Sequence, residues 1–152
     1  MESSMCAQAE CPYKQFMGTL FSINLKVIPH DEQRYETVGD YWWDSIAGVM
    51  QVRVSKMDSH KEFLVAMHEL IELYLIKSKG IEIEEIDKFD KRFEEFRTAY
   101  PDLVGDDEPG DHPKAPYYKE HQIATRMEKW LASTLNEDWD LYTDAVNALY
   151  KA

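Results

Sequence analysis

The stretch Phe63-Leu-Val-Ala-Met-His-Glu-Leu-Ile-Glu-Leu-Tyr-Leu-Ile76 predicts a helix that lies inside the molecule. Only His68, Glu69 and Glu72 can ionise within it, and every other residue is apolar, Ala or Tyr. A helix with so little polar surface is expected to be largely buried. Burying three titratable groups is costly unless they are paired, hydrogen-bonded or bound to a metal. Such a break in the hydrophobic pattern is typical of a functional site.

The spacing of these three residues indicates a metal site. His68 and Glu72 are four residues apart, so they lie on one side of the helix, about 40° apart around its axis, and can reach one cation. Glu69 is turned away by about 100° and is expected to reach a water on that cation. His-Glu-x-x-His helices divide the roles in this way, with two ligands and a Glu base. The sequence therefore predicts His68 and Glu72 as metal ligands and Glu69 as catalytic base.

A third ligand must come from elsewhere, and His121 is the best candidate. Glu128 lies two turns further along the same predicted helix and is expected to be a partner of His121 or another ligand. Asp111 and His112 are weaker candidates for polar contacts, from an acidic loop that could close over the site. The buried face of the helix is predicted from its apolar residues, which are Ile123, Met127, Trp130, Leu131 and Leu135.

Two histidines and one carboxylate with an open position suit a catalytic divalent transition metal. Zinc is the first expectation, and manganese or iron is also compatible with these ligands. The common alternative for a buried histidine is a hydrogen bond without any metal. That alternative stays open for His68 and His121.

The order of the predicted elements indicates an α+β fold with a small antiparallel sheet at its N-terminal side. Strands are expected first, at Leu20–Ile28, Tyr41–Trp43 and Val49–Ser55. About four helices follow, at Glu62–Ser78, around Ile86–Phe96, at Lys119–Leu135 and at Glu137–Tyr150. A proline-rich acidic loop at 101–116 separates the second helix from the third. We expect one domain over 19–152 and a poorly structured stretch at 1–18.

Single residues add further expectations. Asn136 is expected to cap the last helix. Trp42 and Trp43 point to opposite faces of a strand, so at least one of them should lie in the core. Asp90 is expected to be a surface acid.

The charge balance limits the partners. The chain has 17 Lys and Arg against 29 Asp and Glu, a net charge of -12. This argues against binding of nucleic acid, and it favours cations in any carboxylate-lined cleft. No apolar run approaches the roughly 20 residues of a membrane helix, and residues 1–6 lack the features of a signal peptide. We therefore expect a cytoplasmic protein without a membrane partner, in which Cys6 and Cys11 are reduced thiols.

In its order of elements the chain resembles a minimal zincin-type metallopeptidase. Strands come first, a His-Glu-bearing helix follows, and a further ligand lies on a later helix. In that family the strand before the active helix, here Val49–Ser55, lines the cleft and can pair with an extended peptide. Residues 39–72 and 108–128 are also similar to small uncharacterised proteins of phages and bacteria. These carry a similar His-Glu-Leu-x-Glu helix, a Gly-Asp-x-Pro-x-Ala-Pro-Tyr loop and a His-bearing helix. Glu72 in place of the second His departs from the zincin pattern and favours harder metal ions.

Three classes of function are compatible with these features. The first is a metal-dependent hydrolase, a small zincin-like metallopeptidase acting on a peptide or a small molecule. The second is a non-catalytic phage or bacterial accessory protein that binds a partner protein and uses the His-Glu cluster structurally. The third is a nucleotide phosphohydrolase with a His/acid helical site, for which the stretch Gly110-Asp-His-Pro113 would be a part.

Overall fold

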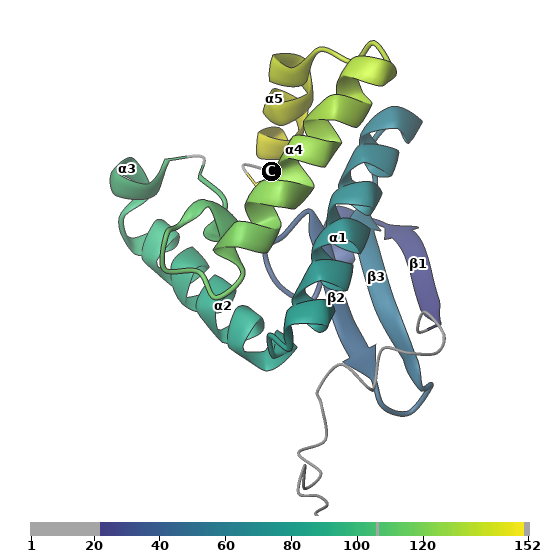
Figure 1. Cartoon of the computed structure of the whole chain (residues 1–152). Helices are drawn as coiled ribbons and strands as arrows, with labels where there is room; N and C mark the ends of the chain where they lie inside the picture. Colours follow the sequence, from purple (N-terminus) through teal and green to yellow (C-terminus); the bar gives the residue numbers. More distant parts are fainter. Residues whose placement is uncertain (1–21, 106, 151–152) are drawn as a thin grey trace, which may run out of the picture.

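The computed structural model describes residues 22–105 and 107–150, and it confirms the α+β class (Figure 1). Cys6, Cys11 and the predicted loose stretch at 1–18 lie outside the described residues. Three strands come first, β1 (Ile23–Ile28), β2 (Gly39–Asp44) and β3 (Val49–Ser55). The helices follow as expected, and a 3-10 turn, η2 (His30–Glu32), lies between β1 and β2.

The sheet is mixed, so the expectation of a purely antiparallel sheet is wrong. Its order is β1-β3-β2, with β2 antiparallel and β1 parallel to β3. The tight turn at 45–48 forces the antiparallel pairing of β2 with β3, and Gly48 adopts a left-handed φ of 66° in it. Because β3 is paired on both sides, the expectation that Val49–Ser55 pairs with a peptide is also wrong. Within the described residues, β2 and β1 are the edge strands.

Helix α1 (Ser59–Lys79) covers one face of the sheet. It begins after Asp58, whose side chain accepts a hydrogen bond from the Lys61 backbone N–H, and it ends at Gly80, which has a left-handed φ of 69°. The expectation that α1 is largely buried does not hold on one side, where Phe63 and Tyr74 are exposed.

Two core clusters lie at either end of α1. One contains Leu73 and Ile76 of α1, together with Tyr41 and Val52 of the sheet. The other contains Leu64 of α1 and residues from several other elements, namely Val38, Val54, Ala132, Tyr142 and Val146. His68 and Glu72 lie on α1 between these clusters. The packing on both sides therefore fixes the part of α1 that carries the ionisable residues.

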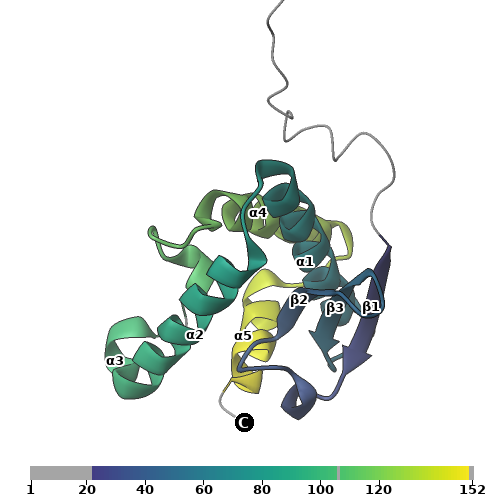
Figure 2. The same cartoon turned by 90° about the horizontal axis from the view of Figure 1, so that it is seen from below.

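The remaining helices are α2 (Ile83–Ala99), α3 (Pro101–Val104), α4 (Tyr118–Thr134) and α5 (Trp139–Leu149), with a 3-10 turn η3 at Pro109–Asp111. Helix α4 lies beside α1, while α2 and α3 extend to the side of the sheet (Figures 1 and 2). No helix among the described residues is long and apolar enough to cross a membrane.

The cap of α5 differs from the expectation. Asp138, with extended backbone, accepts a hydrogen bond from the Leu141 N–H and caps the helix. Asn136 is not the cap, because its φ of 57° places it in the left-handed region just after α4. The prediction for Asn136 is therefore wrong by two residues.

The buried face of α4 is rotated away from the predicted one. Ile123, Met127 and Trp130 are 41%, 42% and 62% exposed. The buried residues of α4 are Glu120, His121, Ala124, Glu128 and Ala132. The polar face turns inward because its His and Glu groups find partners on α1 and α5. The prediction from apolar periodicity is therefore wrong for three of its five residues.

The core residue of β2 is also not the predicted one. Tyr41 is buried, whereas Trp43, on the same face of the strand, is half exposed. Trp42 lies under the guanidinium groups of Arg34 and Arg53, outside the core. The expectation that one of the two tryptophans belongs to the core is wrong.

Candidate metal centre

Helices α1 and α4 bring His68, Glu72 and His121 together at their contact. His68 Nε2 lies 3.1 Å from His121 Nδ1 and 3.3 Å from Glu72 Oε2. His121 Nδ1 lies 2.9 Å from the same Glu72 oxygen. All three side chains are buried. The three residues predicted as ligands thus place three ligand atoms in one small triangle.

The size of this triangle fits a metal ion. A tetrahedral zinc with bonds of about 2.0–2.1 Å holds its ligand atoms about 3.3–3.4 Å apart. The sides of the triangle, 2.9 to 3.3 Å, are close to this separation. A cation at its centre would require the three side chains to move apart by only a few tenths of an ångström.

Carboxylates hold the outer nitrogens of both histidines. His68 Nδ1 lies 2.9 Å from Glu128 Oε2, and His121 Nε2 lies 3.3 Å from Glu108 and 3.6 Å from Asp111. A carboxylate can only accept, so each outer nitrogen carries the proton that it shares. In a neutral imidazole the inner nitrogen then presents a lone pair, which is the usual arrangement of metal-binding histidines.

Glu72 is oriented in the same manner. The Tyr41 hydroxyl donates to Glu72 Oε1 over 2.7 Å and leaves Oε2 for the triangle. Glu128 is held in turn by the Tyr142 hydroxyl. Each of the three candidate ligands therefore has its outer atom fixed by a hydrogen bond or ion pair, and three acceptor atoms converge on one point.

The pKa values show that this arrangement attracts positive charge. Burial would raise the pKa of Glu72, but its contacts with His121 and His68 lower it to about 2. Burial lowers the pKa of His68 and His121, and the surrounding carboxylates outweigh burial and raise both. Without a metal, protons on the imidazoles supply the positive charge that the carboxylates require; a bound cation would replace them.

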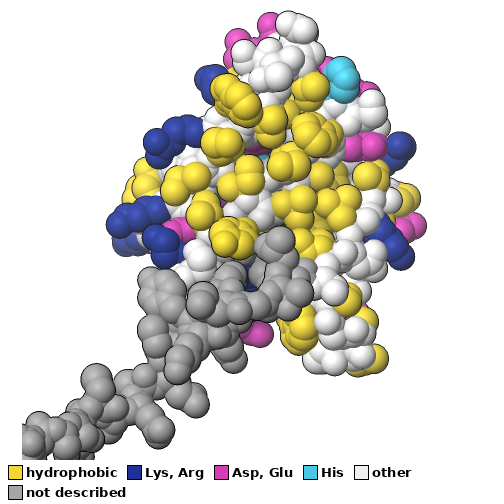
Figure 3. All heavy atoms as spheres, turned by 45° about the vertical axis from the view of Figure 1, so that its right-hand side comes forward, with side chains coloured by type: hydrophobic (Ala, Val, Ile, Leu, Met, Phe, Trp, Pro, Cys, Tyr) yellow, Lys and Arg dark blue, Asp and Glu magenta, His cyan; other side chains and the backbone are white. Residues whose placement is uncertain are grey.

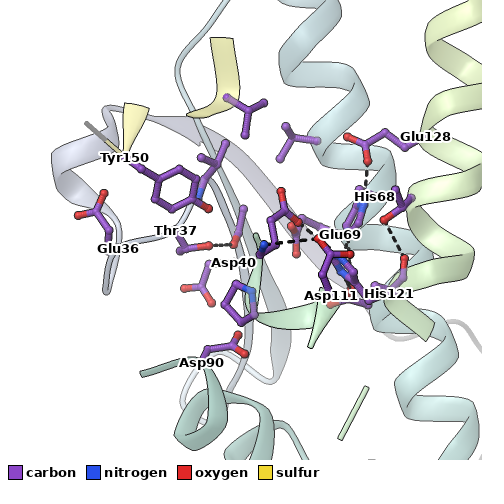
Figure 4. A pocket seen from close by; sticks show the side chains of 18 of the residues that line it. Glu36, Thr37, Asp40, His68, Glu69, Asp90, Asp111, His121, Glu128 and Tyr150 are labelled. Carbon is purple, nitrogen blue, oxygen red and sulfur yellow. Dashed lines mark hydrogen bonds and ion pairs between the residues drawn. The ribbon is translucent and has the colours of Figure 1, made fainter. Parts of the chain in front are cut away.

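Glu69 lies beside the triangle on the wall of a cavity of about 300 Å³ (Figure 4). Burial raises its pKa well above the usual value, and the charge of Glu72 raises it further. Burial therefore favours the protonated form of Glu69, and a cation in the triangle would favour the carboxylate that a general base requires.

The cavity extends from the histidines along β2, α2, η3 and α5, and its lining is acidic. Among the described residues that line it there is no Lys or Arg. The carboxylates of the lining, besides Glu72 and Glu128, are Glu36, Asp40, Glu69, Asp87, Asp90, Glu94, Glu108 and Asp111. This lining favours neutral or cationic ligands over anions.

Asp90 is a residue of this cavity that sequence reasoning misplaced. It is only 7% exposed, so the expectation of a surface acid is wrong. The Tyr117 hydroxyl donates to it over 2.8 Å, and burial raises its pKa to about 7. Asp90 lies four residues after Ile86 and seven after Ile83, both buried on the same face of α2, and this spacing was the signal available in the sequence.

The 3-10 turn η3 contributes one predicted residue and one that was missed. Asp111 was predicted to make polar contacts at the site. It lies near His121 and accepts a hydrogen bond from the side-chain amide of Gln122. Glu108 was not predicted, and its only signal is the reciprocal cap that it forms with Asp111. His112 points elsewhere and packs against the rings of Phe89 and Phe93, so its assignment to the site is wrong.

Glu108, Asp111 and His121 form a second group with converging ligand atoms. The side chains of Glu108 and Asp111 are 41% and 43% exposed, and they face the outer nitrogen of His121. One imidazole binds two cations only after it loses both protons. We therefore interpret Glu108 and Asp111 as supports that orient His121.

Two glycines leave the space that the side chains of Glu69 and His121 occupy. A Cβ atom on Gly39 would lie 2.1 Å from Glu69 Oε1, and a Cβ atom on Gly110 would lie 2.3 Å from His121 Cγ. Neither glycine has a positive φ, so the requirement is for space and not for backbone conformation. One glycine sets the position of the candidate base, and the other sets that of the α4 ligand.

A scan of protein-family models found no matching family, and searches of curated proteins and of solved structures found no match. The resemblance to zincins and to phage and bacterial proteins stays a prediction from the motifs. The candidate metal centre is inferred from the converging ligand atoms of His68, Glu72 and His121.

The two glycines provide a matched pair of variants. Gly110→Ala should weaken zinc binding by about 10- to 100-fold, because the new methyl group displaces His121. Gly39→Ala displaces Glu69 instead and should leave zinc affinity within about threefold. Zinc titration by calorimetry, with circular dichroism to verify the fold, measures both. Equal losses of affinity in the two variants would contradict the assignment of His121 as a ligand.

The burial of Asp90 predicts a pH dependence of stability. Its folded pKa of about 7 lies above the ordinary value, so the native state holds an extra proton between about pH 4 and 7. The contribution of Asp90 to stability therefore falls as pH rises through this window. Asp90→Asn should gain stability over wild type as pH rises from 4 to 7 and keep a constant gain above pH 8. Urea unfolding measures this gain, and a gain independent of pH would oppose the prediction. The exposed Asp102→Asn is the control.

Proposed function

We propose that the protein is a metal-dependent hydrolase of zincin-like design. The observation that carries the proposal is the convergence of three acceptor atoms at metal spacing beside Glu69 and an acid-lined cavity. His68, Glu72 and His121 would hold one divalent transition metal. Zinc is the first candidate, with manganese or iron as alternatives that suit an additional carboxylate ligand.

A bound cation of this kind lowers the pKa of water and polarises a carbonyl or phosphoryl oxygen. Glu69 would accept the proton of the attacking water and deliver it to the leaving group. A cation in the triangle would favour the carboxylate form of Glu69 that accepts this proton. Tyr41, Glu128, Glu108 and Asp111 would keep the ligands in place during the reaction.

The cavity favours a peptide or a small molecule with neutral or positive groups near the scissile bond. Residues 37–41 line the cavity and include the start of β2, whose outer edge has no strand partner among the described residues. An extended peptide would therefore lie along β2 and not along β3. A nucleotide substrate is disfavoured, because its phosphates would meet an acidic lining without a described Lys or Arg.

A structural role is the second candidate. The cluster joins α1 to α4 between two core clusters, and its three ligands are almost wholly buried. A metal held there would also clip the two helices together without any reaction. In that case the protein would act by binding another protein, and Glu69 would have no chemical task.

Metal content tests the site itself. Protein purified without chelator should contain about one transition metal per chain by elemental analysis, and chelation should lower its melting temperature. His68→Ala should lose the metal, because it removes one of three ligands. The exposed His60→Ala on the same helix should retain it. A wild-type chain that neither contains nor is stabilised by zinc, manganese or iron would refute the proposed centre.

Replacement of Glu69 separates the catalytic proposal from the structural one. Glu69→Gln should keep the metal and the fold but reduce turnover by about 10²- to 10⁴-fold, since the amide cannot accept the proton. The assay uses metal-restored protein with a panel of peptides and nucleotides. Glu62→Gln, on the same helix and ion-paired with Lys56, is the control and should retain activity. Undiminished turnover in Glu69→Gln, or metal binding without any turnover of wild type, would favour the structural role.

A further inference from the structure

The outer face built by α1, α4 and β1 is apolar although it is accessible (Figure 3). On α4, Ile123, Met127 and Trp130 follow each other at i, i+4 and i+7, so they lie in one row on the outside. We define this outer apolar face by its exposed residues, Ile23, Leu25, Val27, Phe63, Ile123, Met127 and Trp130. Apolar patches of this kind on a protein surface often mark sites of interaction with a partner.

Strand β1 belongs to the same face because of its register. Ile23, Leu25 and Val27 pair with Met50, Val52 and Val54 of β3, which point toward α1. Helix α1 lies over β3 and β2 and does not cover β1. The β1 side chains therefore continue the apolar surface along the flank of α1, and hydrophobic side chains gather across this side of the molecule in Figure 3.

The charges of the two helices are segregated. The acids of α1 and α4 are all buried or half-buried, and they are Glu62, Glu69, Glu72, Glu120 and Glu128. The bases of α4, in contrast, are all exposed, and they are Lys119, Arg126 and Lys129. The acids therefore lie inward, and the exposed apolar row of α4 is bordered by positive charge. This border is unusual in a chain with a net charge of -12.

We propose that the outer apolar face docks an amphipathic helix of a partner protein, with acidic residues beside its apolar row. A helix can lay such a row on the surface of two neighbouring helices. Acidic residues on one flank of the docked helix would meet Lys119 and Arg126, and the overall negative charge of the chain would exclude acidic segments from its other surfaces. This inference is independent of the proposed hydrolase activity.

The charges disfavour two other occupants. In a two-fold dimer the same face meets itself, which would bring the basic border of each copy near the same border of the other. An anionic membrane attracts clusters of roughly four to eight bases, more than the three on α4, and it would repel the acidic remainder of the chain.

Selection from a display library of helical peptides tests the proposal with the full chain as bait. The enriched peptides should share apolar residues at i, i+3, i+4 and i+7 with Asp or Glu beside them. Met127→Glu combined with Trp130→Glu should weaken the best synthetic peptide by about tenfold or more, because it places charge in the apolar row. Lys119→Glu combined with Arg126→Glu should weaken it less and reduce its salt dependence. Circular dichroism and thermal unfolding verify that the variants fold.

Ile46→Glu combined with Leu141→Glu is the matched control, since both residues are exposed and apolar but lie outside this face. It should leave peptide affinity within about twofold. The proposal is overturned if no peptide is enriched, if the enriched peptides lack acids, or if Met127→Glu with Trp130→Glu binds them as well as wild type does. Binding of phosphatidylserine vesicles instead of peptides would assign the face to a membrane. A dimer in light scattering that dissociates with the same double variant would assign it to a second copy.

Discussion

The contact between α1 and α4 depends on a cluster of buried ionisable groups that must satisfy each other. His68 and Glu72 from one helix meet His121 and Glu128 from the other within a few ångströms. Separating any one of them from its partners would leave a charge or a polar atom buried without compensation, which is far more costly than the loss of an apolar contact. The helices are therefore held at one relative position, and the two core clusters on either side of the contact maintain it.

This constraint also explains the surface. Once the polar residues of α4 are required inside, a helix with 3.6 residues per turn must turn its other side outward. Ile123, Met127 and Trp130 lie on that other side. The protein thus exposes apolar residues as a consequence of how it assembles its site, and the same rotation leaves only basic residues among the exposed charges of α4. The interior site and the outer apolar face both result from the orientation of α4.

The cavity follows from the same arrangement. Segments far apart in the sequence, from Glu36 before β2 to Tyr150 after α5, border the space next to His68 and His121 (Figure 4). Gly39 and Gly110 supply the room that larger residues would fill. Acids from β2, α1, α2, η3 and α4 give the space its negative character, and several of them contact a phenol, a histidine or an arginine. A pocket with this charge and a converging ligand set is suited to hold a cation and a substrate together.

The sequence by itself determined the features that depend on neighbours along the chain. These are the α+β order, the bounds of β3, and the relation of His68, Glu69 and Glu72 on one helix, because helical and strand periods act within a few residues. His121 was also found, since a histidine near the edge of a helix face is a local signal. Only the tertiary structure decided which face of α4 is buried, that Asp90 lies inside, that Glu108 supports His121, and that β1 joins β3 in parallel. Apolar periodicity assumes that burial follows hydrophobicity, and this assumption fails where a paired polar cluster stabilises the interior more than an apolar stripe would.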